Sequence, residues 1–383
     1  MRITRASGLP WLLLGTMAMA MAQPIAAAPD DPAPLRLMVV APSDQDHLAW
    51  AGARRLQEAA RENGLELSVE LAAPTESADT RPDLLVMPVR SLASRVPSLE
   101  VLELPFLYPS TSAVHAVLDG ELGDFIQEEA RKDGWEIVAF WDEGLHIFSG
   151  IKRYDRVRNL RIREFLITRP DPVAEKQFRY WKAYARRIAP EDRGAVLREC
   201  LIASRAATLQ EIVREQLYRV HLSMSLSNHR YEGWVVISPV ERWVEVDSET
   251  RQKFVAALRE TTAWQRNDAK EREAAALAVL QQRGMSIYEV DAGERVAFRQ
   301  ALPDYAELLS DDIDAQKKRK LIELASVGAT TVAGPGTGAG AATTVPGTGD
   351  NAGDAASRSG TGAAAAPEPG RNPAPRAKAR EGD

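Results

Sequence analysis

The side chains that most often catalyse reactions or bind metals are not spaced for either task in this chain. No HExxH, paired CxxC, Walker A or GxSxG motif occurs, and the carboxylates are scattered. The five histidines show no metal-ligand spacing, so a surface or hydrogen-bonded core position is expected for His47, His115 and His221. The sequence therefore predicts no catalytic residue, metal or cofactor, and nothing in these motifs calls for an enzyme.

Arginine is the other residue type here that could recognise a ligand. The stretch from Arg153 to Arg163 is basic, and a guanidinium meets a carboxylate through a planar fork of donors that a lysine cannot reproduce. A solvated run of charges is the alternative for this stretch. The whole chain has a formal net charge of −6. This balance argues against nucleic acid or an anionic membrane surface as a partner, since both are usually bound by clustered Lys and Arg.

Apolar runs and helical patterns alternate along the first part of the chain. Leu35–Val40 and Asp83–Val89 suit buried strands, and Leu65–Leu71 alternates like a half-buried one. Between them, Asp44–Asn63 has a helical pattern that Gly64 ends. Strands that alternate with helices predict an α/β fold with a mainly parallel sheet covered on both faces.

The second half repeats this pattern. Strands are predicted over Trp135–Trp141, Leu160–Phe165 and Trp234–Ser238, and helices over Pro172–Ile188 and Asp192–Ile202. The only cysteine, Cys200, lies in the last of these helices, where a buried structural thiol is expected. A chain of 383 residues suits about two lobes of 100 to 200 residues each.

A long helix is predicted from a cap near Ser248 to a stop at Gly284. Its apolar residues gather at the two ends, and its middle, Arg266–Glu273, is polar nearly all round. A helix with this pattern can bridge two packed bodies across solvent, although a surface helix with a charged middle has the same pattern.

Both ends of the chain differ in composition from the rest. Arg2 and Arg5 precede an apolar run that ends at Ala20-Met21-Ala22, the pattern of a signal peptide (residues 1–22) cleaved before Gln23. The run is shorter than the ~20 residues that span a bilayer. Residues 326–383 are mainly Gly, Ala, Thr and Pro and cannot bury a core, so a disordered tail follows the folded part, residues 23–325.

Several segments, taken in order, resemble the solute receptors of TRAP-type transporters. Glu103–Tyr108 resembles the family's "LPFLF" segment, and Asn159-Leu160-Arg161-Ile162-Arg163 resembles its "LKGLKIR" motif. Further likenesses lie at Gly134–Gly144, Leu217–His229 and Trp234–Trp243. The resemblance extends over most of residues 35 to 305 and implies a two-lobed periplasmic-binding-protein-like fold in which the long helix bridges both lobes.

The resemblance also implies a function. TRAP receptors are periplasmic proteins that close on a small organic acid, often a carboxylate, and deliver it to membrane permease subunits. The arginine that ends the family's "KIR" motif pairs with the ligand carboxylate and matches Arg163. His146 stands where some members have a second ligand-facing arginine, so a ligand contact there is weaker or depends on pH.

The chain departs from the family pattern in ways that leave a second function open. The asparagine of the family's "DGQENP" turn falls on Ala207, and the segment between Leu71 and Asp83 is short. The alternatives are a receptor with altered ligand chemistry and a non-transport periplasmic protein of the same fold, acting as a protein-interaction or sensing module. A periplasmic enzyme is a third, less supported reading.

The N-terminal pattern predicts that the exported chain begins near Gln23 and is recovered as a soluble periplasmic protein. Intact mass spectrometry of the exported protein measures this directly. A mass that still contains Met1 to Ala22, found in the membrane fraction, would show that the segment is an anchor.

Overall fold

The computed structural model describes residues 35–41, 46–71, 82–167, 170–189, 192, 195–196 and 204–331. The predicted signal peptide, Cys200 and most of the predicted tail lie outside these residues. Helix α13 (Ala315–Thr331) includes the first residues of that tail, so the folded part extends beyond the boundary expected at residue 325. None of the helices that the structure describes is both long and apolar enough to cross a membrane.

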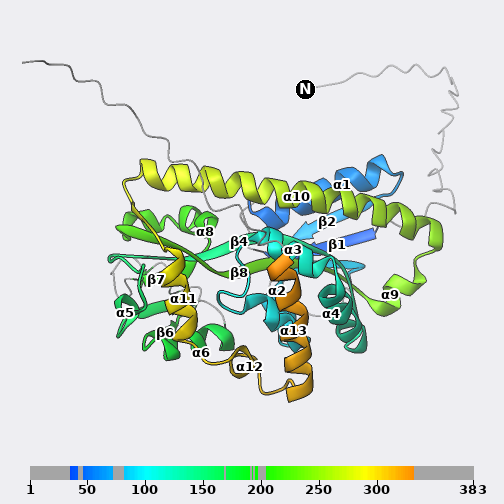
Figure 1. Cartoon of the computed structure of the whole chain (residues 1–383). Coiled ribbons are helices and arrows are strands. Elements are labelled where there is room, and N and C mark those ends of the chain that lie inside the picture. The colour runs from blue at the N-terminus through cyan, green and yellow to red at the C-terminus, as the bar shows by residue number, and fades with distance from the viewer. Residues whose placement is uncertain are drawn as a thin grey trace, which may run out of the picture. The chain divides into compact units, whose positions relative to one another are not determined.

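One mixed sheet organises the molecule, with the strand order β2-β1-β3-β8-β4-β7-β5-β6 and β9 beside β8 (Figure 1). The α/β class is therefore confirmed. The strands are β1 (Leu35–Val39), β2 (Leu67–Leu71), β3 (Leu84–Pro88), β4 (Trp135–Gly150), β5 (Glu164–Ile167), β6 (Tyr184–Arg187), β7 (Ser204–Ala207), β8 (Ser223–Pro239) and β9 (Ser286–Glu289).

The centre of the sheet is antiparallel, so the prediction of a mainly parallel sheet is wrong there. Strands β4 and β8 pair from Trp135 opposite Pro239 to Gly150 opposite Ser223, whereas β1, β2 and β3 pair in parallel. Sequence patterns located only the most apolar part of each long strand. Buried polar residues such as Asp142 interrupt the apolar run of β4 and hide its second half.

The two ends of the β4–β8 ladder carry different sets of elements, which confirms the predicted division into two lobes. Strand β3 pairs with the end of β8 near Trp234, and β7 pairs with the end of β4 near Gly150. The first lobe has α1 (Leu48–Glu62), α2 (Val89–Ala93), the 3-10 turn η1 (Pro97–Glu103), α3 (Thr111–Leu118), α4 (Glu121–Lys132), α9 (Val240–Glu245) and α13. The second has α5 (Val157–Leu160), α6 (Pro172–Tyr180), α8 (Leu209–Arg214), η2 (Leu217–Arg219) and α11 (Ala292–Gln300), and α12 (Tyr305–Leu308) contacts both α6 and α13.

Left-handed residues shorten one predicted helix and delay the start of one predicted strand. The helix predicted over Pro172–Ile188 ends at Tyr180, and strand β6 follows after Lys182, which has φ 58°. The strand predicted over Leu160–Phe165 begins only at Glu164, because Ile162 also has φ 58° and turns the chain. Neither turn contains the glycine that usually marks such a conformation, so residue patterns could not predict them.

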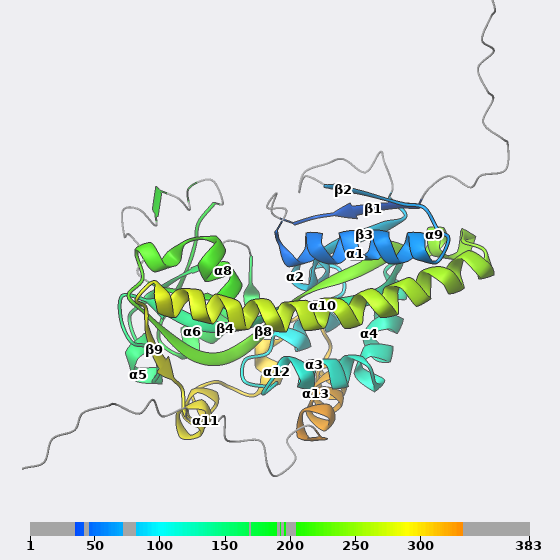
Figure 2. The same cartoon turned by 90° about the horizontal axis from the view of Figure 1, so that it is seen from above.

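Helix α10 (Ser248–Gln282) confirms the predicted bridging helix. Its first half packs Phe254 and Leu258 into the core between β1, β3 and α1, and its last turns pack Ala276 and Leu280 into a separate core on β4 and α8. Figure 2 shows α10 running past both lobes with α1 beside its first half. The N-cap is Asp247, one residue before the expected Ser248.

The middle of α10 contacts the sheet and does not cross open solvent. The fully buried amide of Gln265 accepts a hydrogen bond from the Asp142 N–H at 2.8 Å and donates one to the Asp142 carbonyl at 2.8 Å. The β4–β8 register shifts between Asp142 and Gly144, so Gln265 satisfies backbone groups at an irregular place in the ladder.

Replacing Gln265 by Leu is expected to lower the free energy of unfolding by about 2 to 5 kcal/mol, because two buried backbone groups lose their partner. Denaturant unfolding measures this. Gln281→Leu, at an exposed position of the same helix, is the control and should change stability by less than about 0.5 kcal/mol. Equal effects of the two substitutions would contradict a pinning role for Gln265.

Candidate functional site

The β4–β8 ladder is interrupted where the lobes diverge. His146 lies opposite Arg230, but the next paired residue, Phe148, lies opposite Ser225, so a short segment of β8 has no counterpart in β4. Within this segment the His229 ring stacks on Phe148 with 4.2 Å between centroids. Irregularities of this kind re-aim side chains and are frequent beside binding sites.

His146 and Glu232 form a buried pair next to this interruption. The His146 Nε2 atom lies 2.6 Å from a Glu232 carboxylate oxygen, and the His146 side chain is almost fully buried. Burial alone would raise the pKa of the Glu232 carboxyl, but His146, with Arg90 and Arg230 nearby, holds that pKa well below its usual range. Glu232 is therefore an ionised carboxylate that requires positive neighbours.

Asp171 connects both lobes through two arginines. Its carboxylate lies 3.0 Å from Arg90 of α2 and 2.6 Å from Arg230 of β8, and it also caps α6 by accepting from the Ala174 N–H at 2.9 Å. Burial opposes ionisation of Asp171, but the two guanidiniums outweigh it and lower the pKa to about 2. One carboxylate thus joins the first lobe, the central ladder and the second lobe.

Three N–H donors or ring nitrogens of this network have no hydrogen-bond partner among the described residues. They are Arg90 Nη2, Arg230 Nε and His146 Nδ1, and each atom is shielded from solvent. Polar atoms are seldom left unpaired inside a protein unless a water or a ligand completes them. The two arginine nitrogens can therefore donate hydrogen bonds to the oxygen atoms of a small polar molecule, and guanidinium donors suit a carboxylate.

A second buried network lies beside the first. Glu143 of β4 pairs with Arg214 of α8 at 3.2 Å and accepts from the Trp234 indole at 2.9 Å. Burial raises the pKa of Glu143 to about 7, although Arg214 opposes this. Arg205 of β7 pairs with Glu211 at 3.3 Å and with Glu215 at 2.9 Å.

The two networks meet at the one group that could hold a metal among the residues described. Ligand atoms of His146, Glu211 and Glu232 lie within 4.8 Å of one another. Both carboxylates already interact with arginines. Glu211 forms an ion pair with Arg205, and the positive charge of Arg230 helps to lower the pKa of Glu232. A cation would compete with these guanidiniums, so the charge distribution favours a polar organic ligand over a metal.

The structure separates the two residues singled out from the sequence. His146 lies in the central network, whereas Arg163 lies just before β5 and lines a surface pocket of about 640 Å³ with other basic residues. Among the described residues no hydrogen bond, ion pair or ring contact joins them. The Arg163 Nε atom is buried without a hydrogen-bond partner in the described part of the chain, so it has a donor to offer.

Sequence reasoning missed the residues of the central network. Arg230 and Glu232 lie in a mostly buried strand, where charge is an unusual signal, but Arg90 on a short helix and Asp171 between two prolines carry no such signal. The segment matched to the family's ligand-contacting turn is strand β7, where Ala207 is fully buried in the core. His47, His115 and His221 have core partners, respectively Ala49 N–H, Asp142 and Ser149.

Comparison with known proteins gives a consistent family. Residues 79–311 match the model of the bacterial extracellular solute-binding proteins of family 7, DctP. The C4-dicarboxylate-binding periplasmic protein DctP of Rhodobacter capsulatus is 24% identical over 225 residues, which are 58% of this chain and 66% of that protein. The C4-dicarboxylate-binding protein DctB of Bacillus subtilis is 23% identical over 230 residues, 60% of this chain and 65% of that one. The chain thus spans just under two thirds of the length of these relatives.

Solved structures show the same fold. A TRAP periplasmic solute-binding protein from Ochrobactrum anthropi superposes with a TM-score of 0.68 at 20% identity, covering 76% of this chain and 94% of that one. One from Shewanella oneidensis with bound succinate superposes with a TM-score of 0.67 at 16% identity, covering 78% and 100% respectively. The two-lobed architecture is shared with both.

Replacing Asp171 by Asn should lower the free energy of unfolding by about 3 to 5 kcal/mol, since it leaves two arginines without their shared counter-charge while keeping the helix cap. The pKa of Asp171 falls from 3.8 to about 2 on folding. Its stabilisation is therefore complete above about pH 4 and is lost as the pH falls towards 2.

Urea unfolding across that pH range tests both statements. Asp311→Asn is the control, because the Asp311 side chain is 98% exposed and its ion pairs are weak surface contacts. If the wild type and Asp171→Asn lose stability in parallel as the pH falls, Asp171 does not carry this part of the pH dependence.

Proposed function

Because this chain belongs to family 7 of the bacterial extracellular solute-binding proteins, we propose that it is the receptor of a TRAP-like transporter for a small organic acid. The observation that carries the proposal is the network between the lobes, where shielded arginine and histidine nitrogens have no hydrogen-bond partner among the described residues. The family's role is solute binding and not catalysis. The relatives named for C4-dicarboxylates and the related structures with bound succinate, L-malate or β-D-galacturonate support an acidic ligand.

Ligand binding between the lobes would use the same charges that hold the lobes together. A ligand carboxylate can take up the unused donors of Arg90 and Arg230 while Asp171 keeps its own pairs. It can also displace Asp171, in which case both arginines exchange an internal carboxylate for an external one. Both routes bring guanidiniums of the first lobe and of the ladder onto one ligand, which favours lobe closure.

Arg163 and His146 have separate roles in this proposal. His146 lies in the central network and offers Nδ1 to the ligand. Arg163 stays the anchor suggested by the family motif, and its buried Nε without a partner in the described chain supports that role. Arg90 and Arg230 also have buried nitrogens without a hydrogen-bond partner in the described chain, so the variants below compare Arg163 with Arg90.

Export and delivery complete the proposed function. The N-terminal pattern supports cleavage of a signal peptide and a periplasmic location, and the family supports a membrane permease as the recipient of the ligand.

The non-transport alternative rests on a specific observation. Asp171 already occupies both arginines as a carboxylate ligand would, which suits a protein of this fold that no longer binds a solute.

We expect a carboxylate at about 100 times its dissociation constant to stabilise the fold by ~2.7 kcal/mol, which a thermal-shift screen of mono- and dicarboxylates, keto acids and sugar acids detects. Arg163→Ala should weaken binding of the hit by 2 to 5 kcal/mol, about 30- to 4000-fold, if Arg163 is the anchor. Arg90→Lys keeps a charge for Asp171 but removes the Nη2 donor, and it should cost about tenfold or more if the network binds the carboxylate.

Arg259→Lys, at an exposed position of α10, is the matched control and should leave affinity unchanged. His146→Ala should cost less than Arg163→Ala, because an imidazole gives one ordinary hydrogen bond. If no acid shifts the wild type at about millimolar concentration, where binding would be worth only ~4 kcal/mol, the receptor function is refuted in favour of the non-transport alternative.

A further inference from the structure

The second lobe concentrates positive charge that the net charge of −6 conceals. Arg219 of η2 is exposed and forms no ion pair with any described residue, and the same holds for five other exposed cations of this lobe: Lys152, Arg158, Arg161, Arg179 and Lys182. These five lie after β4, on α5, before β5, on α6 and before β6. Other cations of this lobe have acidic partners, as in the pairs Arg186–Glu164 and Arg187–Glu175, and the second pair lies at one of the two pockets described next.

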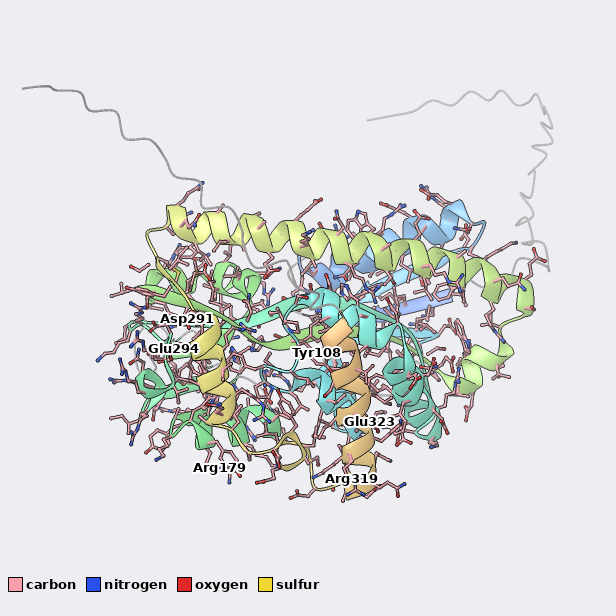
Figure 3. All side chains as sticks on the ribbon, viewed as in Figure 1. Tyr108, Arg179, Asp291, Glu294, Arg319 and Glu323 are labelled. Carbon is pink, nitrogen blue, oxygen red and sulfur yellow. The ribbon has the colours of Figure 1, made fainter. Side chains whose placement is uncertain are left out.

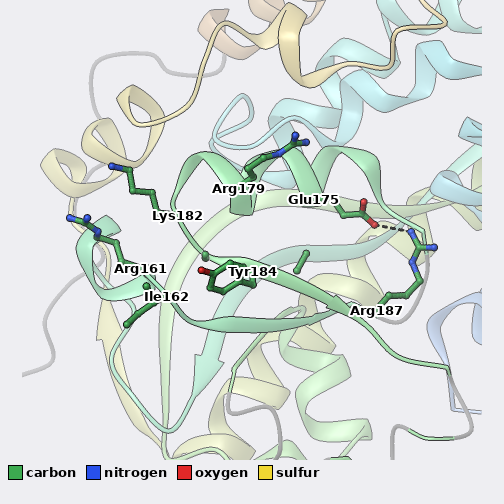
Figure 4. A pocket seen from close by; sticks show the side chains of 9 residues that line it. Arg161, Ile162, Glu175, Arg179, Lys182, Tyr184 and Arg187 are labelled. Atoms are coloured by element: carbon green, nitrogen blue, oxygen red, sulfur yellow. Dashed lines mark hydrogen bonds and ion pairs between the residues drawn. The ribbon is translucent and has the colours of Figure 1, made fainter.

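The five cations other than Arg219 form one continuous surface, which we call the basic face. Lys152 and Arg158 line a pocket of about 640 Å³ with Arg161, and Arg179 and Lys182 line another of about 630 Å³ that also contains Arg161. Arg161 and Lys182 extend in the same direction from one edge of the second pocket (Figure 4). Arg179 points outward at the edge of the second lobe (Figure 3).

An isoleucine projects from the middle of this face. Ile162 lines both pockets, is 72% exposed and has φ 58°, a left-handed conformation that a β-branched residue rarely adopts. Its N–H donates to the Lys182 carbonyl at 2.7 Å, which holds the strained turn in place. Strain of this kind persists where the surroundings enforce it, and it is often found at functional sites.

Other exposed apolar side chains accompany Ile162. Tyr184 lines one of the pockets and is 58% exposed, and Ile151, beside Lys152, is 45% exposed. Leu222 is 66% exposed, and its N–H donates to the carbonyl of Gly150, next to Ile151. Aliphatic and tyrosine side chains set among long cations are typical of surfaces that enter the headgroup region of a membrane.

We propose that the basic face docks on an anionic lipid surface, with Ile162 entering the headgroup layer. The cations are long, exposed and held by no partner in the described chain, so they can follow mobile headgroups at low entropic cost, whereas a specific acidic protein surface favours side chains fixed in advance. The acidic remainder of the molecule is repelled from the same surface, which orients the second lobe towards the lipid. Arg163, the proposed ligand anchor, lines the pocket of about 640 Å³ in this face, but none of the variants below changes it, so lipid binding is tested apart from ligand binding.

Vesicle co-sedimentation tests the proposal with the exported protein. It should bind phosphatidylcholine vesicles that contain phosphatidylglycerol, bind pure phosphatidylcholine much less, and lose binding as salt rises. Reversing three cations, in Arg158→Glu/Lys182→Glu/Arg161→Glu, should weaken binding at least about a hundredfold, because each cation near an anionic membrane is worth about fivefold.

The matched control reverses three exposed cations on the opposite, α1 and α10, side of the molecule: Arg61→Glu, Arg259→Glu and Lys270→Glu. It makes the same change in net charge and should retain most of the binding. Both triple variants keep the N- and C-terminal segments of the wild type, so any contribution of these segments to vesicle binding is the same in all three proteins. Equal loss in both triple variants, or no binding by the wild type, would overturn the proposal.

Ile162→Gly separates docking from folding. Glycine adopts φ 58° without strain, so the melting temperature should not fall, yet vesicle binding should weaken by roughly tenfold through the lost apolar contact. Unchanged binding by this variant would remove Ile162 from the docking surface. A second outcome would also contradict the lipid proposal. If the wild type does not bind the vesicles but binds poly-L-glutamate, and the triple variant with Arg158→Glu loses that binding, the face recognises an acidic protein.

Discussion

The antiparallel ladder between β4 and β8 is the element on which both lobes depend. Strand β3 attaches to one end of it and β7 to the other, so these two strands join the strands of both lobes into one sheet. Helix α10 runs beside the ladder and is joined to its backbone by Gln265. Relative motion of the lobes must therefore bend the ladder, and the interruption between His146 and Phe148 is where it is least regular.

The same interruption explains why so much charge is buried near the middle of the molecule. Each ion there would be costly alone, and each is compensated by a partner from another element, as Asp171 is by Arg90 and Arg230. Compensation of this kind fixes the relative position of helices and strands more than it adds to stability. It also leaves one buried nitrogen each of Arg90 and Arg230 without a hydrogen-bond partner in the described chain.

Sequence patterns gave a good account of the parts of the fold that rest on local signals. The α/β class, the two lobes and the bridging helix are confirmed, because apolar periodicity and helix stops are visible in short windows. The antiparallel centre was missed, since pairing Trp135 with Pro239 is a relation between distant segments. The polar middle of α10 misled for a similar reason: Gln265 is polar because it binds backbone, and no pattern within the helix shows its partner.

The candidate site was harder to predict from the sequence than the fold. A family motif pointed to Arg163 and His146, but Arg90, Asp171 and Arg230 come from three separate elements and meet only in the fold. The topology that brings them together also bears on how the chain folds. Leu85 of β3 pairs with Ile237 of β8, and α5, α6 and α8 of the second lobe lie between them in sequence, so the contact order is high. Chains with a high contact order fold slowly. Until β8 pairs with β3, one edge of β3 stays unpaired and can aggregate. A chaperone would protect the chain most in this partly folded state.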